Sequence, residues 1–338
     1  MDNSLATWLR LREPADAAAR SESLTEWIAA ALPRDQPIRA VDLATGTGAN
    51  LRYLAPRLPH RQRWLVVDRD AALLALMPAV TASWGVARHY DVRTSANGCV
   101  IRGERLECDV EARQLDLGTS TDIELFTGRH LVTASALLDL VSERWLRALA
   151  GQCRAVGAAA LFAITYNGSS SCSPAEPDDE MIRDLLNRHQ KRDKGLGGPA
   201  AGPDAAECAA RCFAEVGYTV RSEPSNWTLG SAEQELQRRL IEGWAEAAME
   251  TGADASTITR WRDRRIGHLD AGRSRIVVGH VDVAALTPQD QPRASAIDTA
   301  RTPSAGRPSI FLARCARPRP LRGPATSTKF PSSHRITV

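Results

Sequence analysis

Short apolar runs and stretches with helical spacing alternate through the first half of the chain. The run 38–43 is too short for a helix, and Gly46 and Gly48 follow it at once. Apolar residues then recur at helical spacing over 50–58, and a second apolar run covers 63–70. A strand, a glycine turn, a helix and a strand in this order predict a βαβ unit, whose two strands are parallel.

The same alternation of short runs and helical patterns continues toward the C-terminus. The further predicted elements are helices at 71–79, 143–150, 179–189, 205–215 and within 231–265, and strands at 110–117, 129–135, 158–166, 218–223 and 275–283. Three of the first four strands, counted from 38–43, end in a carboxylate, at Asp42, Asp68 and Asp116. The pattern indicates an α/β sheet whose strand ends carry acidic side chains.

Three segments depart from this regular alternation. Runs at 86–92 and 99–108, the latter turning at Gly103, predict a β-hairpin inserted beside the main sheet. Segment 169–204 is polar and rich in glycine and proline, which predicts a cover loop around its one helix.

Helix ends are expected at residues that cap or break helices. Residues 1–37 are predicted to be helical, with Ser23 or Thr25 as a cap and Pro33 as the end. Asp204 is expected to cap the helix at 205–215, and Gly217 to terminate it.

Composition is that of a globular protein with a sizeable core. The 338 residues are 43% hydrophobic and 25% charged. No apolar run approaches the roughly 20 residues that span a bilayer, and the first residues lack a signal-peptide pattern. A cytoplasmic location is therefore expected, with no membrane partner.

The formal charge of +3 is unevenly distributed along the chain. Residues 287–338 hold nine Lys or Arg and two Asp, a net +7, so the remaining 34 basic and 38 acidic residues give −4. This last segment is rich in Pro, Ser, Thr and Arg without periodicity and is predicted to be disordered. Because the body is acidic, the basic balance is weak support for a nucleic-acid partner.

The seven cysteines form no CxxC pair. Cys99 and Cys108 could face one another across the hairpin, and Cys208 and Cys212 stand at helical spacing. Disulfide bridges and a zinc site are alternatives that the sequence leaves open. Reduced cysteines in the core are favoured, and no metal is expected.

The turn after the first strand distinguishes between nucleotide-type cofactors. A dinucleotide fingerprint needs a third glycine where Leu51 stands, and the chain has no Lys-Ser/Thr pair for a phosphate-cradling P-loop. The stretch from Asp42 to Gly48 resembles the first motif of class I S-adenosylmethionine-dependent methyltransferases, an acidic residue followed by x-G-x-G-x-G. Ala44 replaces the first glycine of that motif. The resemblance continues through 66–68, 115–117 and 131–141, and covers about 35–170.

The resemblance implies S-adenosyl-L-methionine as the cofactor and a role for each matching residue. The backbone of Gly46, Thr47 and Gly48 would lie close to the methionyl and ribose parts of the cofactor, with Asp42 near its amino group. The cofactor-binding residues implied are Asp42, Ala44, Gly46, Thr47, Gly48, Asp68, Arg69, Asp116, Leu117, Ala134 and Ser135. Asp68 would bind the ribose hydroxyls and Asp116 the adenine amino group, while Asp91 competes with Asp116 for that place.

Methyl transfer needs a general base only when the acceptor is protonated. His189 and Tyr166 are the catalytic candidates, and Asp139 and Asn167 also lie within reach of the predicted pocket. An ordinary surface histidine and a core tyrosine are the alternatives for the first two.

The resemblance implies a Rossmann-like, seven-stranded, mostly parallel sheet with helices on both faces. Residues 1–37 would cover the cofactor site, 38–286 would form the methyltransferase domain, and 287–338 the tail. The insertions within the domain would be 86–111, 169–204 and 231–265, the last of them helical.

Several functions follow from this cofactor site. A methyltransferase of a small molecule is the leading hypothesis. An RNA methyltransferase that uses the basic tail is an alternative, but the fourth strand is followed by Ser-Ala-Leu-Leu and not by an Asn-Pro-Pro-Tyr-type motif. A cofactor-binding module without turnover is a third, and an NAD-dependent oxidoreductase a more distant fourth. The acceptor and the oligomeric state are not specified by the sequence.

Overall fold

A βαβ unit forms the middle of the main sheet. The computed structural model describes residues 4–118 and 123–289, so the basic tail and its predicted disorder lie outside the described residues. Strands β1 (Ile38–Leu43) and β2 (Arg61–Asp68) are parallel neighbours, and α3 (Ala49–Leu54) with the short η1 (Ala55–Arg57) connects them. The predicted unit is thereby confirmed.

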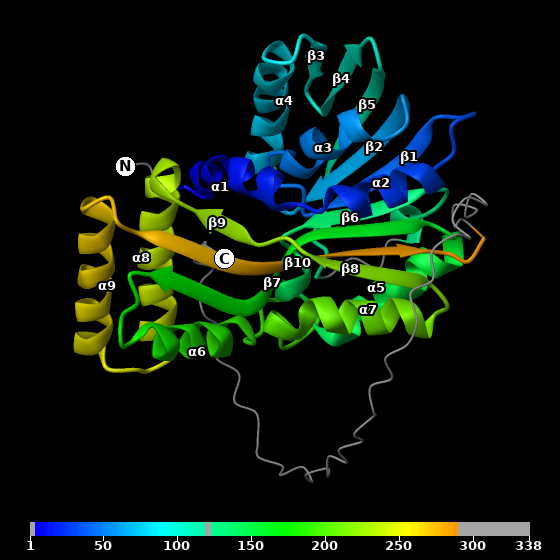
Figure 1. Cartoon of the computed structure of the whole chain (residues 1–338). Helices are drawn as coiled ribbons and strands as arrows, with labels where there is room; N and C mark the ends of the chain where they lie inside the picture. The colour runs from blue at the N-terminus through cyan, green and yellow to red at the C-terminus, as the bar shows by residue number, and fades with distance from the viewer. Residues whose placement is uncertain (1–3, 119–122, 290–338) are drawn as a thin grey trace, which may run out of the picture. The chain divides into compact units, whose positions relative to one another are not determined.

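Within the described residues, ten strands form one sheet. The others are β3 (Asp91–Ser95), β4 (Gly98–Gly103), β5 (Leu106–Gln114), β6 (Leu131–Ser135), β7 (Ala159–Ser173), β8 (Thr219–Pro224), β9 (Trp227–Leu229) and β10 (Arg275–Leu286). Their order is β3-β4-β5-β2-β1-β6-β7-β10-β8, with β9 beside β10 (Figure 1). Strands β5, β2, β1, β6 and β7 are parallel, and β10 runs antiparallel to β7 and β8. Apart from the β3–β4 hairpin and β9, this is the predicted seven-stranded sheet.

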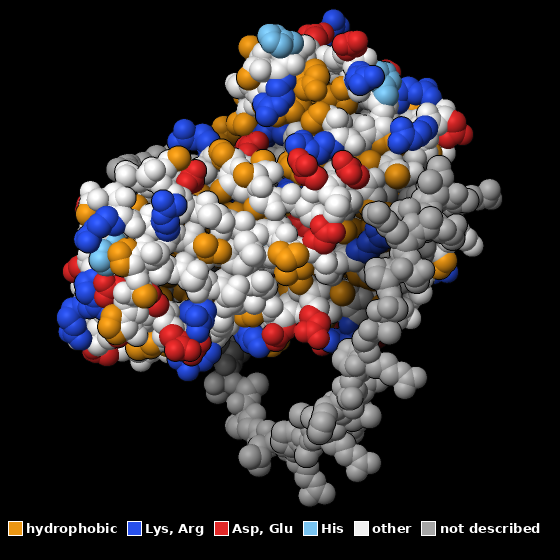
Figure 2. All heavy atoms as spheres, viewed as in Figure 1, with side chains coloured by type: hydrophobic (Ala, Val, Ile, Leu, Met, Phe, Trp, Pro, Cys, Tyr) orange, Lys and Arg blue, Asp and Glu red, His pale blue; other side chains and the backbone are white. Residues whose placement is uncertain are grey.

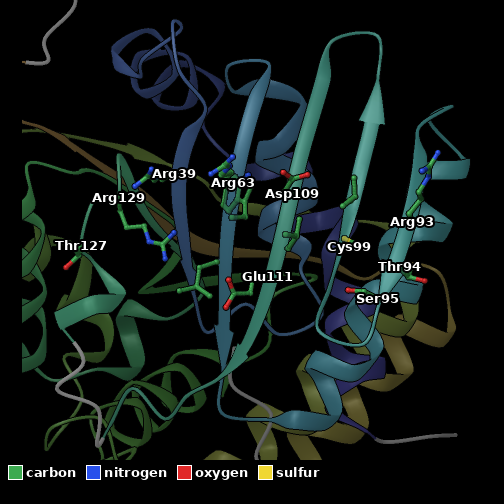
Figure 3. A pocket seen from close by; sticks show the side chains of 14 residues that line it. Arg39, Arg63, Arg93, Thr94, Ser95, Cys99, Asp109, Glu111, Thr127 and Arg129 are labelled. Atoms are coloured by element: carbon green, nitrogen blue, oxygen red, sulfur yellow. The ribbon is translucent and has the colours of Figure 1, made fainter.

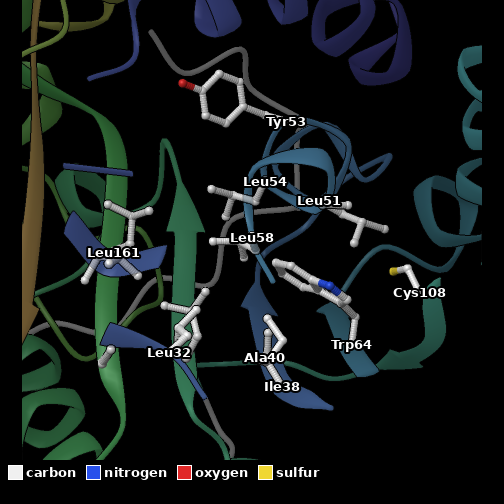
Figure 4. Close-up of a cluster of buried hydrophobic side chains, with 14 of the residues drawn as sticks. Leu32, Ile38, Ala40, Leu51, Tyr53, Leu54, Leu58, Trp64, Cys108 and Leu161 are labelled. Atoms are coloured by element: carbon white, nitrogen blue, oxygen red, sulfur yellow. The ribbon is translucent and has the colours of Figure 1, made fainter. Parts of the chain in front are cut away.

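Helices cover both faces of this sheet because successive strand residues point to opposite sides. On one face α2 (Glu22–Ala31), α3 and α4 (Ala71–Val86) pack on alternate residues of β1 and β2. Figure 4 shows Leu51 and Leu54 of α3 over Trp64 and Ala40 in this cluster. On the other face, α5 (Glu143–Val156) and α7 (Ala205–Glu215) pack on the intervening residues of β1 and β2, such as Val41 and Leu65.

A third hydrophobic cluster supports the long ends of β7 and β10. Helices α1 (Leu5–Ala19), α6 (Asp179–Gln190), α8 (Gln234–Glu250) and α9 (Ala255–Asp270) contribute to it. Trp244 and Trp261 are buried in it, as anchors of the helical insertion predicted at 231–265. Figure 1 shows α8 and α9 beside the far ends of these two strands.

The structure corrects part of the predicted hairpin. Residues 86–90 form no strand, because α4 continues to Val86 and β3 begins only at Asp91, but β3 and β4 do pair as an antiparallel hairpin at the edge of the sheet. The expected hairpin strand and third core strand are one strand, β5, which pairs with β4 on one side and β2 on the other. β5 pairs with β2 without interruption from Glu107 to Gln114, so no break separates the two expected strands.

Strand and helix ends also differ from the predictions. β7 runs to Ser173, so the first residues of the predicted cover loop are strand paired with β10. Ser21 caps α2 through its side chain, in place of Ser23 or Thr25. Asp204 stands at the N-cap of α7 as predicted but makes no capping hydrogen bond, because its carboxylate binds Lys191 Nζ at 2.8 Å.

The six described cysteines are free thiols, and five of them are buried. Cys108 lies opposite Ile101 and not opposite Cys99, so these two do not face one another across the hairpin. Their burial raises the pKa of the Cys99 thiol to about 11. These cysteines serve as core residues.

Candidate functional site

The turn between β1 and α3 is built from left-handed backbone conformations. Ala44, Gly46 and Gly48 have φ of +53°, +56° and +85°. The Gly48 N–H donates to Thr45 O at 2.9 Å, and the Thr45 N–H donates to Val67 O of β2 at 2.9 Å. Glycine adopts this region without strain and alanine does so at a cost, so Ala44 holds the conformation against its own preference.

Asp42 at the end of β1 is the centre of a buried hydrogen-bond network. Its carboxylate accepts from Thr45 Oγ1 at 2.5 Å and from Asn50 Nδ2 at 2.6 Å. Asn50 also accepts from Arg20 Nη1 at 2.6 Å and lies 3.1 Å from Thr133 Oγ1 of β6. Burial raises the pKa of Asp42 to about 6, against the opposing effect of these donors.

Asp68 ties the end of β2 to the glycine turn. Its two carboxylate oxygens accept from the Gly46 N–H at 2.8 Å and the Asp70 N–H at 2.9 Å. The side chain is buried, and this burial raises its pKa although both N–H groups lower it. Arg69, which follows it, is exposed.

Asp116 and Leu117 lie directly beyond the end of β5. The Leu115 N–H donates to Asp68 O at 2.8 Å, which keeps this segment beside β2. Asp116 is exposed and accepts from the Gly118 N–H at 2.9 Å. Its competitor Asp91 begins the outer strand β3, two strands from β5, and is paired with Arg93 at 3.2 Å. The geometry therefore favours Asp116 at this strand edge.

Part of the predicted cover loop lies against the β5 end. A Cβ on Gly118 would lie 2.2 Å from Gly195 O, so the two backbones are in close contact. Leu196 O accepts from the Ser142 N–H at 3.1 Å, and Trp145 Nε1 donates to Leu117 O at 3.1 Å. This part of the loop borders Asp116. That the whole segment 169–204 covers the site stays a prediction.

The chain after β6 contributes a third buried carboxylate, in addition to Asp42 and Asp68. Ala134 is buried and Ser135 half-buried at the end of β6, and the 3-10 turn η3 (Leu138–Leu140) follows. Asp139 in this turn is 1% exposed, and neither of its oxygens has a side-chain hydrogen-bond partner. Burial raises its pKa to about 7, while the backbone N–H groups of Asp139 and Tyr166 and the charges of Arg12 and Lys194 oppose that rise.

The two residues first considered for catalysis make contacts that support the fold. Tyr166 is fully buried in β7 and its hydroxyl donates to Asn187 Oδ1 at 2.9 Å. His189 of α6 lies with Nε2 3.1 Å from Glu250 Oε2 of α8, and burial lowers its pKa. Asn167 turns back on Ser169. These contacts leave a catalytic role for either residue a prediction.

Helix α1 lies directly on the glycine turn. A Cβ on Gly46 would approach Leu9 Cδ1 to 2.8 Å, so a larger residue there would require Leu9 to shift, in addition to the strain of φ +56°. Glu13 of α1 is paired with Arg52 of α3 at 2.6 Å. Arg20, Asn50 and Arg52 were not predicted from the sequence as parts of the site, although Asn50 stands only two residues after the motif.

Two of the cavities formed by the described residues lie against the sheet. One of about 330 Å³ lies between α1 and α3 and is lined by Asn50, Ser135 and Arg20, among others. The other, of about 550 Å³, is lined from β1, β2, β5 and the hairpin (Figure 3), and it contains no residue of the glycine turn. Of these two cavities, the larger one therefore does not lie at the predicted cofactor edge.

The described residues contain no group of three or more His, Cys, Asp or Glu arranged to hold a metal ion. None of the helices in residues 4–118 and 123–289 combines the length and apolar character that crossing a bilayer requires. On the face seen in Figure 2, acidic and basic side chains are interspersed, and hydrophobic ones are mostly scattered.

No family model matches the chain, and no curated protein matches it. Among solved structures, it overlays cyclopropane synthase MmaA2 from Mycobacterium tuberculosis with a TM-score of 0.42 and 12% identity, covering 84% of this chain and 95% of that one. Phosphoethanolamine N-methyltransferase 2 from Haemonchus contortus, solved with S-adenosylhomocysteine, gives 0.41 and 13%, covering 84% and 58%. Geranyl diphosphate methyltransferase, solved with sinefungin, gives 0.38 and 12%, covering 78% and 77%. Each is a similarity of fold.

Proposed function

We propose that the chain is an S-adenosyl-L-methionine-dependent methyltransferase that acts on a small molecule. The observation that supports this most directly is the Asp42–Gly48 turn, with the Gly46 N–H bound to the Asp68 carboxylate. Strand order reverses between β1 and β6, and in open α/β sheets ligands bind beyond the strand ends at such a point. The turn lacks the third glycine of a dinucleotide site and the lysine of a P-loop.

The residues along this edge fit the parts of that cofactor. Asp68 uses one lone pair on each oxygen for a backbone N–H, which leaves acceptor capacity for two ribose hydroxyls. Asp116 and the Leu117 N–H would bind the adenine edge, and Gly46, Thr47 and Gly48 would pass the methionyl part. Because Leu9 rests on Gly46, we infer that α1 moves aside when the cofactor enters.

The cofactor, when bound, supplies an electrophilic methyl group on a sulfonium. The chain's contribution is then to hold acceptor and methyl in line, which supplies much of the rate. Ser135 borders both the end of β6 and the cavity between α1 and α3, so this cavity is our proposed route for the acceptor. Two nitrogens of buried Arg20 in its wall, Nε and Nη2, have no hydrogen-bond partner.

Asp139 is our proposed proton acceptor, in preference to His189 and Tyr166. No side chain binds its oxygens, whereas His189 and Tyr166 are both hydrogen-bonded to other side chains of the fold. A pKa of about 7 lies near working pH, where a general base is most effective. It would take the proton that a hydroxyl or ammonium acceptor releases.

The test combines cofactor binding with methyl transfer. Calorimetry with S-adenosylhomocysteine should show binding to the wild-type chain and at least tenfold weaker binding to Asp68→Ala, since Asp68 would contact the cofactor. Methyl transfer from labelled cofactor to the small-molecule fraction of a cell extract should occur with wild type. The Asp139→Asn chain should bind the cofactor normally and transfer far less.

Other outcomes would replace the proposal. Tight NAD(H) binding without S-adenosylhomocysteine binding would indicate an oxidoreductase. Cofactor binding without transfer to any small molecule or RNA would indicate a binding module. Transfer to RNA that is lost on deleting 287–338 would indicate an RNA methyltransferase.

A further inference from the structure

A group of arginines lies on the sheet face opposite α3 and α4, apart from the cofactor edge. Arg39 of β1 and Arg63 of β2 are direct neighbours in the parallel register, so they point to the same face. Arg129, just before β6, lines the same cavity of about 550 Å³. Figure 3 shows the three side chains converging from three segments of the chain.

Within residues 4–118 and 123–289, none of these three guanidinium groups lies in an ion pair. The carboxylates of the cavity wall are paired with other arginines: Asp109 binds Arg102 at 2.8 Å, and Glu111 lies 3.5 Å from Arg113. Arg129 Nε donates to Leu125 O, and its charge is attracted by Glu111 but repelled by Arg39 and Arg113. Like charges on directly paired strand positions repel one another, so their grouping costs stability unless an anion is bound.

The described part of the connection between β5 and β6 packs with the α5 and α7 cluster through Leu125 and Phe126. Its only regular element there is the short 3-10 turn Ile123–Leu125. Arg39 and Arg63 are exposed, and Arg129 is half-buried. Clustered arginines with free N–H forks are well suited to phosphate or carboxylate groups.

We propose that this cavity is a binding site for a small polyanion of the phosphate class, held by Arg39, Arg63 and Arg129. Asp109 and Glu111 on the β5 side would repel an extended phosphate backbone, so a compact ligand fits better than a nucleic acid. The basic segment 287–338 has the wrong sign of charge to fill the cavity. The site is independent of the proposed methyl transfer.

Calorimetry with inorganic pyrophosphate on the full chain tests the site. Wild type should bind it with a submillimolar Kd, and Arg63→Gln and Arg39→Gln should each weaken binding roughly tenfold, the loss typical of a charge-assisted contact. The matched control is Arg93→Gln, which lines the same cavity but removes an arginine already paired with Asp91. It should change the Kd less than twofold.

Three results would overturn the proposal. One is the absence of pyrophosphate binding to a folded wild-type chain at 10 mM, on the order of the weakest affinities that matter for recognition. Another is equal weakening in Arg63→Gln and Arg93→Gln, which would indicate general charge attraction. The third is binding of a short RNA to the same arginines more tightly than pyrophosphate. Because Arg39 and Arg63 are exposed, these variants should fold like wild type.

Discussion

The two sides of the predicted cofactor edge are built differently. On the β1–β6 side, defined here by Asp42, Asn50, Thr133 and Asp139, every polar group is buried. On the β5 side, defined by residues 115–118, Asp116 is exposed and the segment is held by backbone contacts and Trp145. The first side is a fixed part of the core, whereas the second depends on a surface loop.

This contrast has a physical origin in the sheet. β1 has neighbours on both sides and helices on both faces, so a polar group at its end is shielded from water and must find partners inside the protein. At the end of β5, the described residues in contact with the segment include the loop around Gly195 and Trp145 of α5. Rigid positioning is thus expected for the methionyl half of the cofactor and adaptable contact for the adenine half.

The largest expected effect concerns Asp139 on the β1–β6 side. Its folded pKa of about 7 lies above the ordinary 3.8, so the folded chain retains the proton that the unfolded chain has already lost. The free energy of unfolding should therefore fall between pH 4 and pH 7 through this group. Asp139→Asn removes that fall and should be more stable than wild type by about 2–4 kcal/mol at pH 8.

Urea unfolding of both chains at several pH values measures this difference. The difference should be small at pH 4 and grow up to about pH 7. Asp116→Asn, on the exposed β5 side, is measured in parallel as the control for an Asp-to-Asn substitution at the same edge. An Asp139→Asn chain less stable than wild type at pH 8 would mean that the carboxylate has a bound partner.

The second effect compares two carboxylates that would contact the cofactor. Asp68 is buried and receives two backbone N–H groups, whereas Asp116 is exposed and receives one. Asp68→Asn should lower the affinity for S-adenosylhomocysteine by roughly 30- to 100-fold, and Asp116→Asn by roughly tenfold or less. Calorimetry gives both values. Equal losses would show that the β5 side is as well fixed as the β1–β6 side once the cofactor is bound.

The third effect concerns the indole contact that holds the β5 side. Trp145→Phe removes the donor to Leu117 O but keeps most of the apolar packing. We expect a loss of about 1 kcal/mol in unfolding free energy and faster amide exchange at 115–118. Exchange in the turn 44–48 should not change, because its hydrogen bonds lie on the other side.

The β1–β6 side could be predicted from the sequence better than the β5 side, because its signals are local and lie in buried strands. The run 38–43, its glycines and the strand at 131–135 carry strong local signals, and their strands and turn are confirmed. The polar residues of β5 concealed a nine-residue strand, since the pairing with β2 and β4 that forms it is not local. Because much of β5 is only partly buried, its hydrophobic pattern is weak and does not mark the full length of the strand.

Long-range contacts account for the other differences in the site. Nothing local indicates that Arg20 would reach Asn50, 30 residues away, or that Leu9 would rest on Gly46. The extension of β7 to Ser173 depends on β10, more than a hundred residues later. Such pairings follow from the assembled sheet and could not be predicted from residue spacing.

The smallest effect concerns the backbone of the turn itself. Ala44 occupies φ +53° where the methyltransferase motif has glycine, and Ala136 after β6 has φ +54°. Left-handed alanine costs about 1 kcal/mol relative to glycine, although glycine also gains entropy in the unfolded chain, so Ala44→Gly should raise the unfolding free energy by at most about 1 kcal/mol. Ala136→Gly is the matched control, with the same φ outside the motif. If only Ala44→Gly also weakens S-adenosylhomocysteine binding, the strained alanine stiffens the β1–β6 side for its ligand; if both variants bind equally well, the glycine and alanine forms of the turn are equivalent.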